Sequence, residues 1–343
     1  MAEHGVVLSE RGRVALEEIE VDEPGPGEVL VRIEATGVCH SDLHVIEEDG
    51  WGHPYPVLLG HEGAGTVEAV GAGVTTAAEG DRVVLGWKTA CGACAACARG
   101  EPRQCKRPPA AVGRLRRRNG DVLTPVLRTG TFATRTVVPA GGAVPVPREL
   151  PVEQACLLGC ALATGVGSVL ETAQVREGAR VAVIGCGAVG LSVVQGARIA
   201  GASRIHALDL DSGKAEQARS FGATDTEPGP ADYVFDVVGR RATFEQGLSL
   251  LASGGTYVLI GLSPGGERGE VDLPRLFGKR ARILVSHGGE HLPEEDFPRL
   301  AAWALEGRLD LASMVARVAP LEGWQEALDA LREGALLRTV LTP

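Results

Sequence analysis

The chain has 343 residues, of which 44% are hydrophobic and 4% aromatic, and its formal net charge is −10. This length suggests about two domains, and the apolar content allows a sizeable core. The acidic balance argues against a nucleic-acid partner, which would need a basic face, and no apolar run reaches the roughly 18 residues that predict a membrane span.

The N-terminal part of the chain predicts a small β domain. It opens MAEHGVVLSERGRVALEEIE, which lacks the apolar run of a signal peptide. Because the chain also has eight cysteines, we expect it to work in a reducing cytosol. Short β-branched segments follow at 29–33, 65–70 and 81–85, and glycine and proline turns separate them. We expect an antiparallel barrel or sandwich here.

Four cysteines close in sequence follow this β region: Cys91, Cys94, Cys97 and Cys105. The spacing C-x2-C-x2-C-x7-C lets four thiolates close a tetrahedron around one zinc ion, which leaves no open position and makes the site structural. A disulfide cluster is the alternative, but disulfides suit secreted chains, and the close spacing suits a metal better. Cys39, His61 and Cys160 form a second possible ligand set outside this lobe.

From Arg180 onward the chain alternates strand and helix. Expected strands lie at 180–185, 204–209, 233–238, 256–260 and 282–286, with helices at 188–200 and 212–221. This alternation predicts a doubly wound parallel sheet. The second helix ends near Gly222 and the next strand starts near Asp232, so only the nine residues 223–231 separate them, although a parallel crossover needs about a dozen. We therefore expect one edge strand to be short or absent and its crossover helix to be missing.

The rest of the chain predicts a helix near 297–306 and a closing strand at 337–341.

A dinucleotide fingerprint lies between the first strand and the first helix of this alternating region. Gly185, Gly187 and Gly190 form G-x-G-x-x-G, which lets a pyrophosphate approach the backbone at a helix N-terminus. Asp209 follows Gly190 by 19 residues, at the end of the next strand. It would bind the ribose hydroxyls and repel a 2′-phosphate, which favours NAD over NADP. The alternative is a glycine-rich turn of another α/β protein.

With these motifs the whole chain resembles the zinc-dependent medium-chain alcohol dehydrogenases. The resemblance includes GVCHSD at 37–42, GHEG at 60–63, the four-cysteine lobe, LGC at 158–160 and RTVL at 338–341. It is closest to a bacterial subgroup that includes thiol-dependent formaldehyde dehydrogenases and aryl or aliphatic alcohol dehydrogenases. It implies an α/β protein with three parts: a GroES-like β-barrel catalytic domain at 1–161 with the structural zinc lobe at 91–105, an NAD-binding Rossmann domain at 162–290, and a segment at 291–343 that returns to the catalytic domain.

The resemblance also assigns the second metal set. Cys39, His61 and Cys160 match the ligands of a catalytic zinc, whose fourth position stays open for water or substrate. Asp42 matches the group that orients His61, and Glu62 matches a carboxylate that can approach the metal.

A proton path and a substrate pocket follow from the same resemblance. Ser41 matches the hydroxyl that takes the alcohol proton, and His44 matches the far end of the relay. Trp51 and Trp87 match positions that line the substrate cleft, and packing in the core is the equal alternative.

Four further residues match cofactor contacts. His40 and Arg338 stand where relatives contact the pyrophosphate, Lys214 where they contact the ribose, and Thr164 beside the nicotinamide.

The activity implied is hydride transfer from a zinc-bound alkoxide of a primary aliphatic, aryl or allylic alcohol to NAD, and the reverse reaction. A thiol-dependent formaldehyde dehydrogenase is the alternative, and a catalytically inactive zinc-binding regulatory protein is a distant one. The expected partners are a small alcohol or aldehyde and further copies of the chain, as a homodimer with a homotetramer as the alternative. The basic run at 114–118 predicts a solvated loop, with attraction of an anionic substrate as a second idea.

Overall fold

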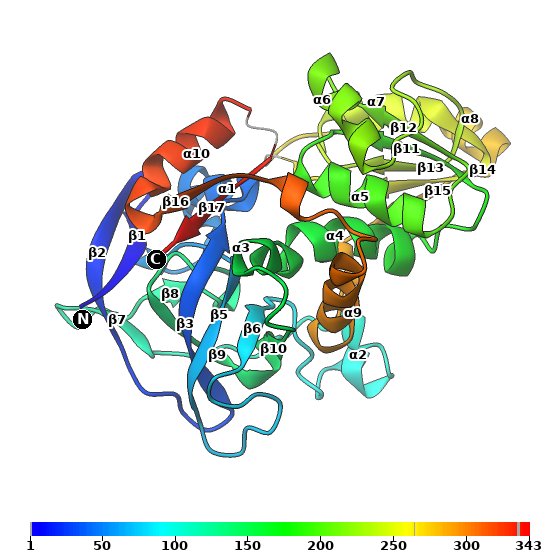
Figure 1. The fold of residues 1–343 in the computed structure, drawn as a ribbon. Coiled ribbons are helices and arrows are strands. Elements are labelled where there is room, and N and C mark those ends of the chain that lie inside the picture. The colour runs from blue at the N-terminus through cyan, green and yellow to red at the C-terminus, as the bar shows by residue number, and fades with distance from the viewer. Residues whose placement is uncertain (1, 264, 335–336) are drawn as a thin grey trace. The chain divides into compact units, whose positions relative to one another are not determined.

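The computed structural model describes residues 2–263, 265–334 and 337–343. The chain divides into two compact units, one made of Met1–Cys160 with Leu292–Pro343 and the other of Ala161–His291. In Figure 1 the first unit runs from blue through cyan to the green of α3 and again from orange to red, and the second unit runs from the green of α4 to yellow. The sequence predicts these boundaries at 161/162 and 290/291.

The first unit is built on two sheets. One has the strand order β7-β2-β1-β4-β8, and the other has the order β10-β6-β5-β3-β17-β16, with β9 also paired to β3. Neighbours run antiparallel except for the pairs β4–β8 and β16–β17. The strands are β1 (Glu3–Glu10), β2 (Arg13–Val21), β3 (Glu28–Gly37), β4 (Val57–Leu58), β5 (Glu62–Val70), β6 (Arg82–Leu85), β7 (Leu115–Arg117), β8 (Thr124–Pro125), β9 (Arg135–Pro139), β10 (Ala143–Pro145), β16 (Val315–Pro320) and β17 (Arg338–Thr342). The predicted β domain is confirmed: two predicted strands lie inside β3 and β5, and the third begins one residue before β6.

Short helices and turns connect these strands. The α-helices are α1 (His40–Glu47), α2 (Ala95–Ala98), α3 (Val152–Ala155), α9 (Pro293–Leu305) and α10 (Trp324–Arg332). The 3₁₀ turns are Asp49–Gly52, Pro102–Gln104, Val126–Arg128, Ala140–Gly142, Cys156–Gly159, Ala312–Met314 and Leu321–Gly323.

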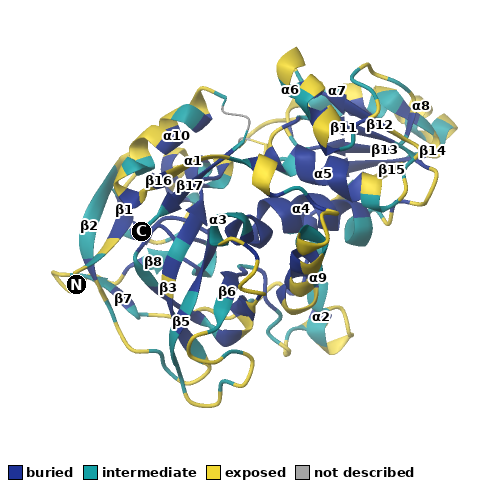
Figure 2. Ribbon diagram, in the orientation of Figure 1, coloured by how far each residue is buried: buried dark blue, intermediate teal, exposed yellow. Residues whose placement is uncertain are grey.

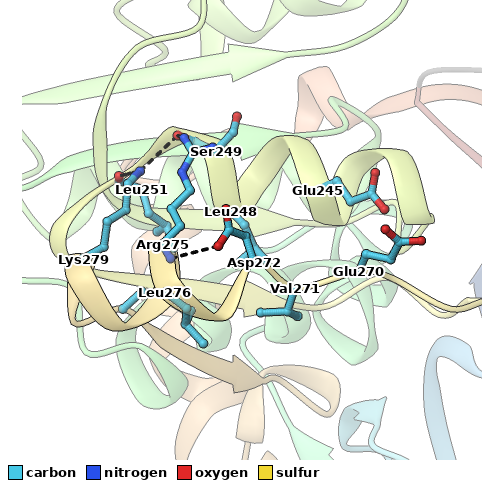
Figure 3. Close-up of a pocket in the computed structure, with 11 residues that line it drawn as sticks. Glu245, Leu248, Ser249, Leu251, Glu270, Val271, Asp272, Arg275, Leu276 and Lys279 are labelled. Atoms are coloured by element: carbon cyan, nitrogen blue, oxygen red, sulfur yellow. Dashed lines mark hydrogen bonds between the residues drawn. The ribbon is translucent and has the colours of Figure 1, made fainter.

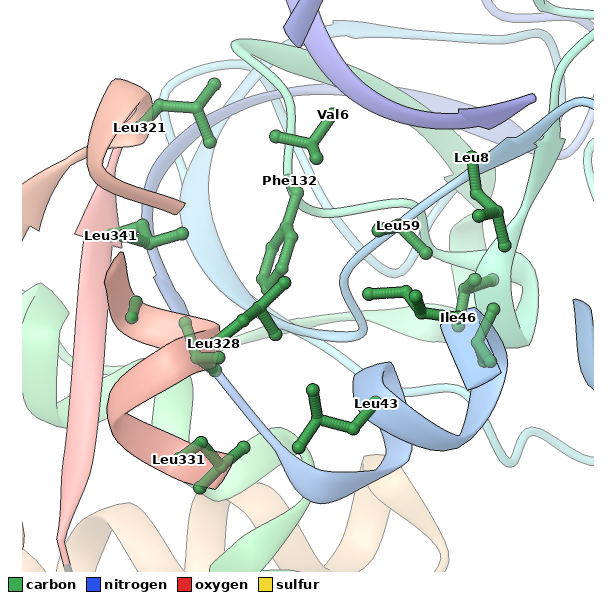
Figure 4. Packing of buried hydrophobic residues seen from close by; sticks show 14 of the residues in the cluster. Val6, Leu8, Leu43, Ile46, Leu59, Phe132, Leu321, Leu328, Leu331 and Leu341 are labelled. Carbon is green, nitrogen blue, oxygen red and sulfur yellow. The ribbon is translucent and has the colours of Figure 1, made fainter. Parts of the chain in front are cut away.

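One apolar cluster of the first unit fixes the position of α1. Figure 4 shows Leu43 and Ile46 of α1 facing the same cluster as Leu328 of α10 and Leu341 of β17. Leu43 and Ile46 are three residues apart and therefore share one helix face. Because α1 begins directly after Cys39, this packing also holds the start of the predicted metal site in place.

The second unit is a parallel sheet flanked by helices. The strand order is β12-β11-β13-β14-β15, and every neighbouring pair is parallel. The strands are β11 (Arg180–Ile184), β12 (Arg204–Leu208), β13 (Ala231–Asp236), β14 (Leu251–Leu259) and β15 (Arg282–Val285). The helices are α4 (Ala161–Gly167), a π-turn (Ser168–Thr172), α5 (Ala188–Ile199), α6 (Ser212–Gln217), α7 (Arg241–Leu250) and α8 (Leu273–Lys279), with 3₁₀ turns at Ala218–Phe221 and Gly288–Glu290. The predicted Rossmann sheet is confirmed, and Figure 2 shows its central strands buried and α6 largely exposed.

The predicted deletion beside β12 is also confirmed. A single parallel bridge, His206 to Asp225, stands where an edge strand would run, and residues 223–230 contain no helix. The His206 ring Nδ1 lies 2.8 Å from the carbonyl oxygen of Glu227, and a Cβ at Gly229 would come within 2.7 Å of the same ring. The short connection therefore packs directly on β12.

The basic run at 114–118 is not the solvated loop that the sequence predicts. Its residues Leu115–Arg117 form β7 against β2. Arg114 pairs with Glu28 at 2.7 Å and Arg117 with Glu17 at 2.8 Å. Since carboxylates neutralise these charges, the run is poorly suited to attract an anionic substrate.

Among the described residues, no single helix is both long and apolar enough to cross a membrane. One bent pair of helices, Val152–Gly159 and Ala161–Thr172, meets the length and composition of a membrane span when its two helices are taken together.

Candidate metal centres and cofactor site

Three buried side chains that are far apart in sequence come together in the first unit. Cys39 caps the start of α1, His61 lies between Gly60 and the first residue of β5, and Cys160 follows the turn Cys156–Gly159. One ligand atom from each lies within 4.8 Å of those from the other two. The structure thus assembles the ligand set that the resemblance predicts.

The hydrogen bonds of His61 leave one ring nitrogen for a metal. His61 Nδ1 lies 3.2 Å from Asp42 Oδ1, and an ionised carboxylate only accepts, so Nδ1 donates the proton. Nε2 is buried and has no hydrogen-bond partner among the described residues. A buried nitrogen lone pair beside two sulfur atoms fits a zinc ion with three protein ligands and an open fourth position.

Asp42 connects two of the ligands. Its Oδ2 atom accepts a hydrogen bond from the Cys39 backbone N–H at 2.9 Å, while Oδ1 faces His61. Asp42 is fully buried, so both contacts are protected from water. The predicted orienting role is therefore geometrically available to it.

Arg338 lies against the same metal set. Strand β17 runs antiparallel to β3, with Val340 opposite Gly37, and this register brings the Arg338 side chain beside Cys39. Arg338 Nη2 is 3.2 Å from Cys39 Sγ, and Nε is 3.0 Å from Glu62 Oε2. The structure thus places the guanidinium beside the predicted ligand Cys39 and beside Glu62, and its predicted contact with a pyrophosphate stays a prediction.

The electrostatics of this cluster favour a thiolate. A hydrogen bond with Cys160, together with the charge of Arg338, outweighs burial and holds the pKa of Cys39 well below its ordinary value. Burial lowers the pKa of Arg338, but the neighbouring Cys39 and Glu62 raise it overall. The deprotonated sulfur is the form that binds metals.

The predicted proton path begins beside this site. Ser41 Oγ lies 3.9 Å from Cys39 Sγ, at the N-terminal turn of α1. One helical turn later, His44 Nδ1 is 2.8 Å from Glu48 Oε1, and its ring stacks on Trp51 with 6.4 Å between centroids. Sequence reasoning missed Glu48, although a glutamate four residues after a histidine on a helix is a recognisable contact pattern.

The two predicted pocket tryptophans have different surroundings. Trp51 is half-buried, packs on the cluster of Figure 4 and has a positive φ of 52°. Trp87 is half-buried beyond β6, and its carbonyl oxygen accepts a hydrogen bond from Arg128 Nη1 at 3.3 Å.

The four-cysteine lobe has the geometry of a closed metal site. The ligand atoms of its members lie within 4.8 Å of one another, and all four thiols are free. Cys94 Sγ is 3.6 Å from Cys97 Sγ and 3.9 Å from Cys105 Sγ. A zinc–sulfur bond of 2.3 Å gives a tetrahedral edge of about 3.8 Å, whereas a disulfide requires about 2 Å. The distances therefore fit zinc and exclude a disulfide among these three sulfurs.

Backbone donors support the same reading of the lobe. The Cys94 N–H points to Cys91 Sγ and the Cys91 N–H to Cys105 Sγ, both at 3.3 Å. Backbone hydrogen bonds at Cys97 and Lys106 lower the pKa of Cys94 to about 6. Backbone hydrogen bonds also lower the pKa of Cys91, whereas burial and the hydrogen bond with Cys94 raise the pKa of Cys97 to about 11. Two of the four sulfurs therefore favour the thiolate form.

The glycine fingerprint has the shape that a dinucleotide requires. Gly185 has a φ of 97°, and a Cβ at Gly190 would lie 1.9 Å from the Gly185 carbonyl oxygen. A Cβ at Gly187, the residue before α5, would meet nothing within 4 Å. Open space before a helix N-terminus is where a pyrophosphate binds.

Asp209 stands at the end of β12, beside this fingerprint. Its carboxylate accepts hydrogen bonds from the Cys186 N–H at 2.8 Å and the Asp211 N–H at 3.0 Å. The first bond ties the acidic side chain directly to the glycine loop.

The structure places the other predicted cofactor residues on three helices. Lys214 is half-exposed on α6, Thr164 is buried in α4, and His40 is exposed at the first position of α1.

A separate pocket of about 330 Å³ lies between α7 and α8. Figure 3 shows its cations turned toward the backbone: Arg275 reaches the carbonyl oxygen of Ser249 at 3.1 Å, and Lys279 contacts those of Ser249 and Leu251. These contacts satisfy the charged groups, and the pocket has no part in the sites described above.

Comparison with known proteins shows the family of the chain. Residues 25–148 match the alcohol dehydrogenase GroES-like domain, and residues 188–306 match the zinc-binding dehydrogenase domain. An S-(hydroxymethyl)glutathione dehydrogenase of Photobacterium damsela subsp. piscicida is 36% identical over 352 aligned positions, which cover 94% of this chain and 95% of that protein. The chain belongs to the zinc-dependent medium-chain alcohol dehydrogenase family.

Solved structures of this dehydrogenase family share the whole fold. An alcohol dehydrogenase zinc-binding domain protein from Burkholderia ambifaria is 34% identical, with a TM-score of 0.93 over 100% of this chain and 99% of that one. A benzyl alcohol dehydrogenase from Acinetobacter calcoaceticus is 27% identical, with a TM-score of 0.91 over the same shares. The present dehydrogenase is thus a zinc-containing enzyme with a GroES-like and a Rossmann domain.

Proposed function

We propose that this dehydrogenase interconverts primary alcohols and aldehydes with NAD as hydride acceptor and donor, using one catalytic and one structural zinc per chain. The observation that carries the proposal is the set Cys39, His61 and Cys160, in which His61 Nε2 is buried and unpartnered. A set of three protein ligands is typical of catalytic zinc, and the four-cysteine lobe supplies the structural site.

Zinc held by these three residues would act as a Lewis acid, which lowers the pKa of a hydroxyl group that it binds. The chain's own residues then manage the proton. Ser41, placed beside Cys39, accepts the proton of the alcohol, and His44 passes it toward solvent. The Glu48 carboxylate can only accept, so it accepts a hydrogen bond from the Nδ1–H of His44, which leaves Nε2 as the acceptor on the other side of the ring.

The choice of NAD rests on Asp209. The Cys186 and Asp211 amides hold its carboxylate at the glycine loop. A fixed negative charge at the ribose position repels a 2′-phosphate and accepts hydrogen bonds from ribose hydroxyls.

A second copy of the chain is the proposed partner, as a homodimer, with a homotetramer as the larger possibility. Strand β15 is an edge of its sheet, and Val285 on it is 67% exposed. Phe277 of α8, just before this strand, is 87% exposed. Open strand edges with apolar side chains favour pairing with another chain.

The proposed location is a reducing cytosol, which the free cysteines of the chain would require.

Two relatives support different substrates within this activity, an aryl alcohol in one case and a thiol adduct of formaldehyde in the other. The test is NADH formation with benzyl alcohol, 1-hexanol and formaldehyde, the last with and without glutathione, and NADP as a second cofactor. Turnover of the alcohols with NAD supports the proposal. Turnover of formaldehyde alone, and only with glutathione, would favour the adduct enzyme, and no turnover with any of them would revive a regulatory zinc protein.

A further inference from the structure

Asp236 is a buried carboxylate that has no part in the sites described above. It ends strand β13, and within the described residues of the second unit it is the only acidic side chain that is buried. Burying a carboxylate costs free energy unless hydrogen bonds replace the water that it loses. Three neutral groups donate such bonds to Asp236, two from the backbone and one from a phenol.

One oxygen of this carboxylate holds the turn that follows β13. Asp236 Oδ1 accepts hydrogen bonds from the Val238 N–H at 2.9 Å and from the Gly239 N–H at 3.0 Å. Gly239 has a φ of 72°, and a Cβ there would lie 2.4 Å from the carbonyl oxygen of Gly261. The turn is therefore bonded on one side and packed tightly against the residues after β14 on the other.

Tyr257 holds the other oxygen. Its hydroxyl donates to Asp236 Oδ2 at 2.6 Å, and the residue is fully buried in the adjacent strand β14. The ring packs edge-on against Phe244 of α7, with 5.2 Å between centroids. Burial, together with the hydrogen bond and the charge of Asp236, raises the pKa of Tyr257. The phenol therefore stays protonated and keeps its donor.

The turn after β13 packs on the glycine loop. Strand register places Gly185, Asp209 and Val237 at one level, each directly after the carboxyl end of its strand. A Cβ at Gly185 would lie 2.8 Å from Val238 and 3.1 Å from Val237. The Val237 N–H also donates to the carbonyl oxygen of Ile184 at 3.0 Å. Ligands of parallel sheets bind at this edge, so the turn supports the loop predicted to bind the pyrophosphate.

We propose that Asp236, held in place by Tyr257, is a positioning residue for NAD. It fixes the turn Val237–Gly239 against the glycine loop and thereby raises the affinity for the dinucleotide. A loop that loses this support is less well organised for its ligand, although every group that contacts the ligand is still present. The proposal rests on the proposed function, because it concerns the cofactor of the same site.

The test measures binding of NADH directly, by its fluorescence, in the zinc-loaded full-length protein. Asp236→Ala removes all three hydrogen bonds. Asp236→Asn is the conservative variant, because its amide oxygen can accept from both backbone N–H groups and its NH₂ group can donate to the Tyr257 oxygen. Tyr257→Phe removes one donor and keeps the ring. Circular dichroism establishes that each variant is folded at the temperature of the titration.

Asp232→Ala is the matched control. Asp232 lies on the same strand as Asp236, and it too accepts a hydrogen bond from a backbone N–H, that of Arg180 at 2.9 Å. It also pairs with the Arg180 side chain at 2.8 Å. These contacts lie at the start of β11 and β13, at the end of the sheet opposite to the glycine loop, so their loss costs stability without disturbing the loop.

We expect Asp236→Ala to raise the Kd for NADH about tenfold and Tyr257→Phe to raise it roughly threefold. Asp236→Asn and Asp232→Ala should stay within about twofold of the wild type. The KM for NAD should rise in parallel with the Kd. The kcat at saturating NAD should stay near that of the wild type, because the proposed metal ligands are unchanged.

Two results would overturn the inference alone: an unchanged Kd in Asp236→Ala, or an equal rise of the Kd in Asp232→Ala, which would show that only general stability matters. If Asp236→Ala does not fold, Tyr257→Phe decides, and a wild-type Kd in that variant would reject the role of the pair. A wild type that does not bind NADH would instead remove the proposed cofactor together with the inference.

Discussion

Asp42 contacts two members of the proposed catalytic metal set. It holds His61 through one carboxylate oxygen and the Cys39 backbone through the other, and it is fully buried. Its position three residues after Cys39 lets α1 carry a ligand and the group that orients a second ligand. Carboxylates that orient ligating histidines raise metal affinity by a factor of about 10 to 100.

We therefore expect Asp42→Asn to lower zinc affinity at the catalytic site about 10- to 100-fold without emptying the four-cysteine lobe. Asparagine keeps an oxygen for the Cys39 N–H but loses the negative charge that faces His61. Competition with a chromophoric chelator would show one zinc released early and one retained. Two zinc ions released together, at wild-type rates, would contradict this role of Asp42.

Glu48 tests the proton path in the same way. Glu48→Ala should lower kcat for alcohol oxidation about tenfold, because His44 loses the partner that orients its ring. Glu48→Gln keeps an acceptor oxygen and should stay near wild type. Glu47→Ala is the matched control, since Glu47 pairs with Arg332 at 3.1 Å and not with His44. Equal losses in Glu47→Ala and Glu48→Ala would show that only the stability of α1 matters.

For single residues, the sequence predicts functional roles only where the residues belong to recognisable motifs. Cys39, His61 and Cys160 were identifiable because metal ligation restricts residue type and spacing, and the structure brings them together. The position of Arg338 beside Cys39 has no such signal, because it depends on the register of β17 on β3.

Among the elements, periodic segments were predicted well and context-dependent ones were not. The Rossmann strands and α5 follow from buried β-branched runs and glycine punctuation, and each lies within a few residues of its predicted place. The sequence analysis did not predict helix α10. Its buried apolar residues Ala327, Leu328 and Leu331 pack against α1 and β17, which are distant in sequence. The run at 114–118 was misread as a loop because its pairing partner, β2, is distant in sequence.

Strand β15 is the element that decides the proposed assembly. A lysine at Val285 would place a charge on the exposed edge strand and should convert a dimer to a monomer in analytical ultracentrifugation. Leu305→Lys is the control, because Leu305 is 46% exposed at the end of α9 and far from β15 in sequence. A wild type that sediments as a monomer, or a Val285→Lys variant that stays dimeric, would contradict pairing through this edge.

In the whole molecule, the residues proposed to bind metal and those proposed to bind the cofactor lie in different units. The first unit gathers both cysteine sets, and the second provides the glycine loop and Asp209. Each metal set draws on its own segments of the first unit, so loss of one zinc need not empty the other site. The four-cysteine lobe is further tied to α9 by Arg103, which reaches Glu295 at 2.7 Å and Asp296 at 2.6 Å.

The central claim is that Cys39, His61 and Cys160 hold a catalytic zinc. The most direct test is to count zinc and follow NADH formation from benzyl alcohol on the same samples of wild type and His61→Gln. If these residues hold a catalytic zinc, the wild type should contain about two zinc ions per chain and turn over benzyl alcohol. The His61→Gln variant should contain about one zinc ion per chain and show no turnover. A His61→Gln enzyme that keeps both zinc ions and its activity would contradict it.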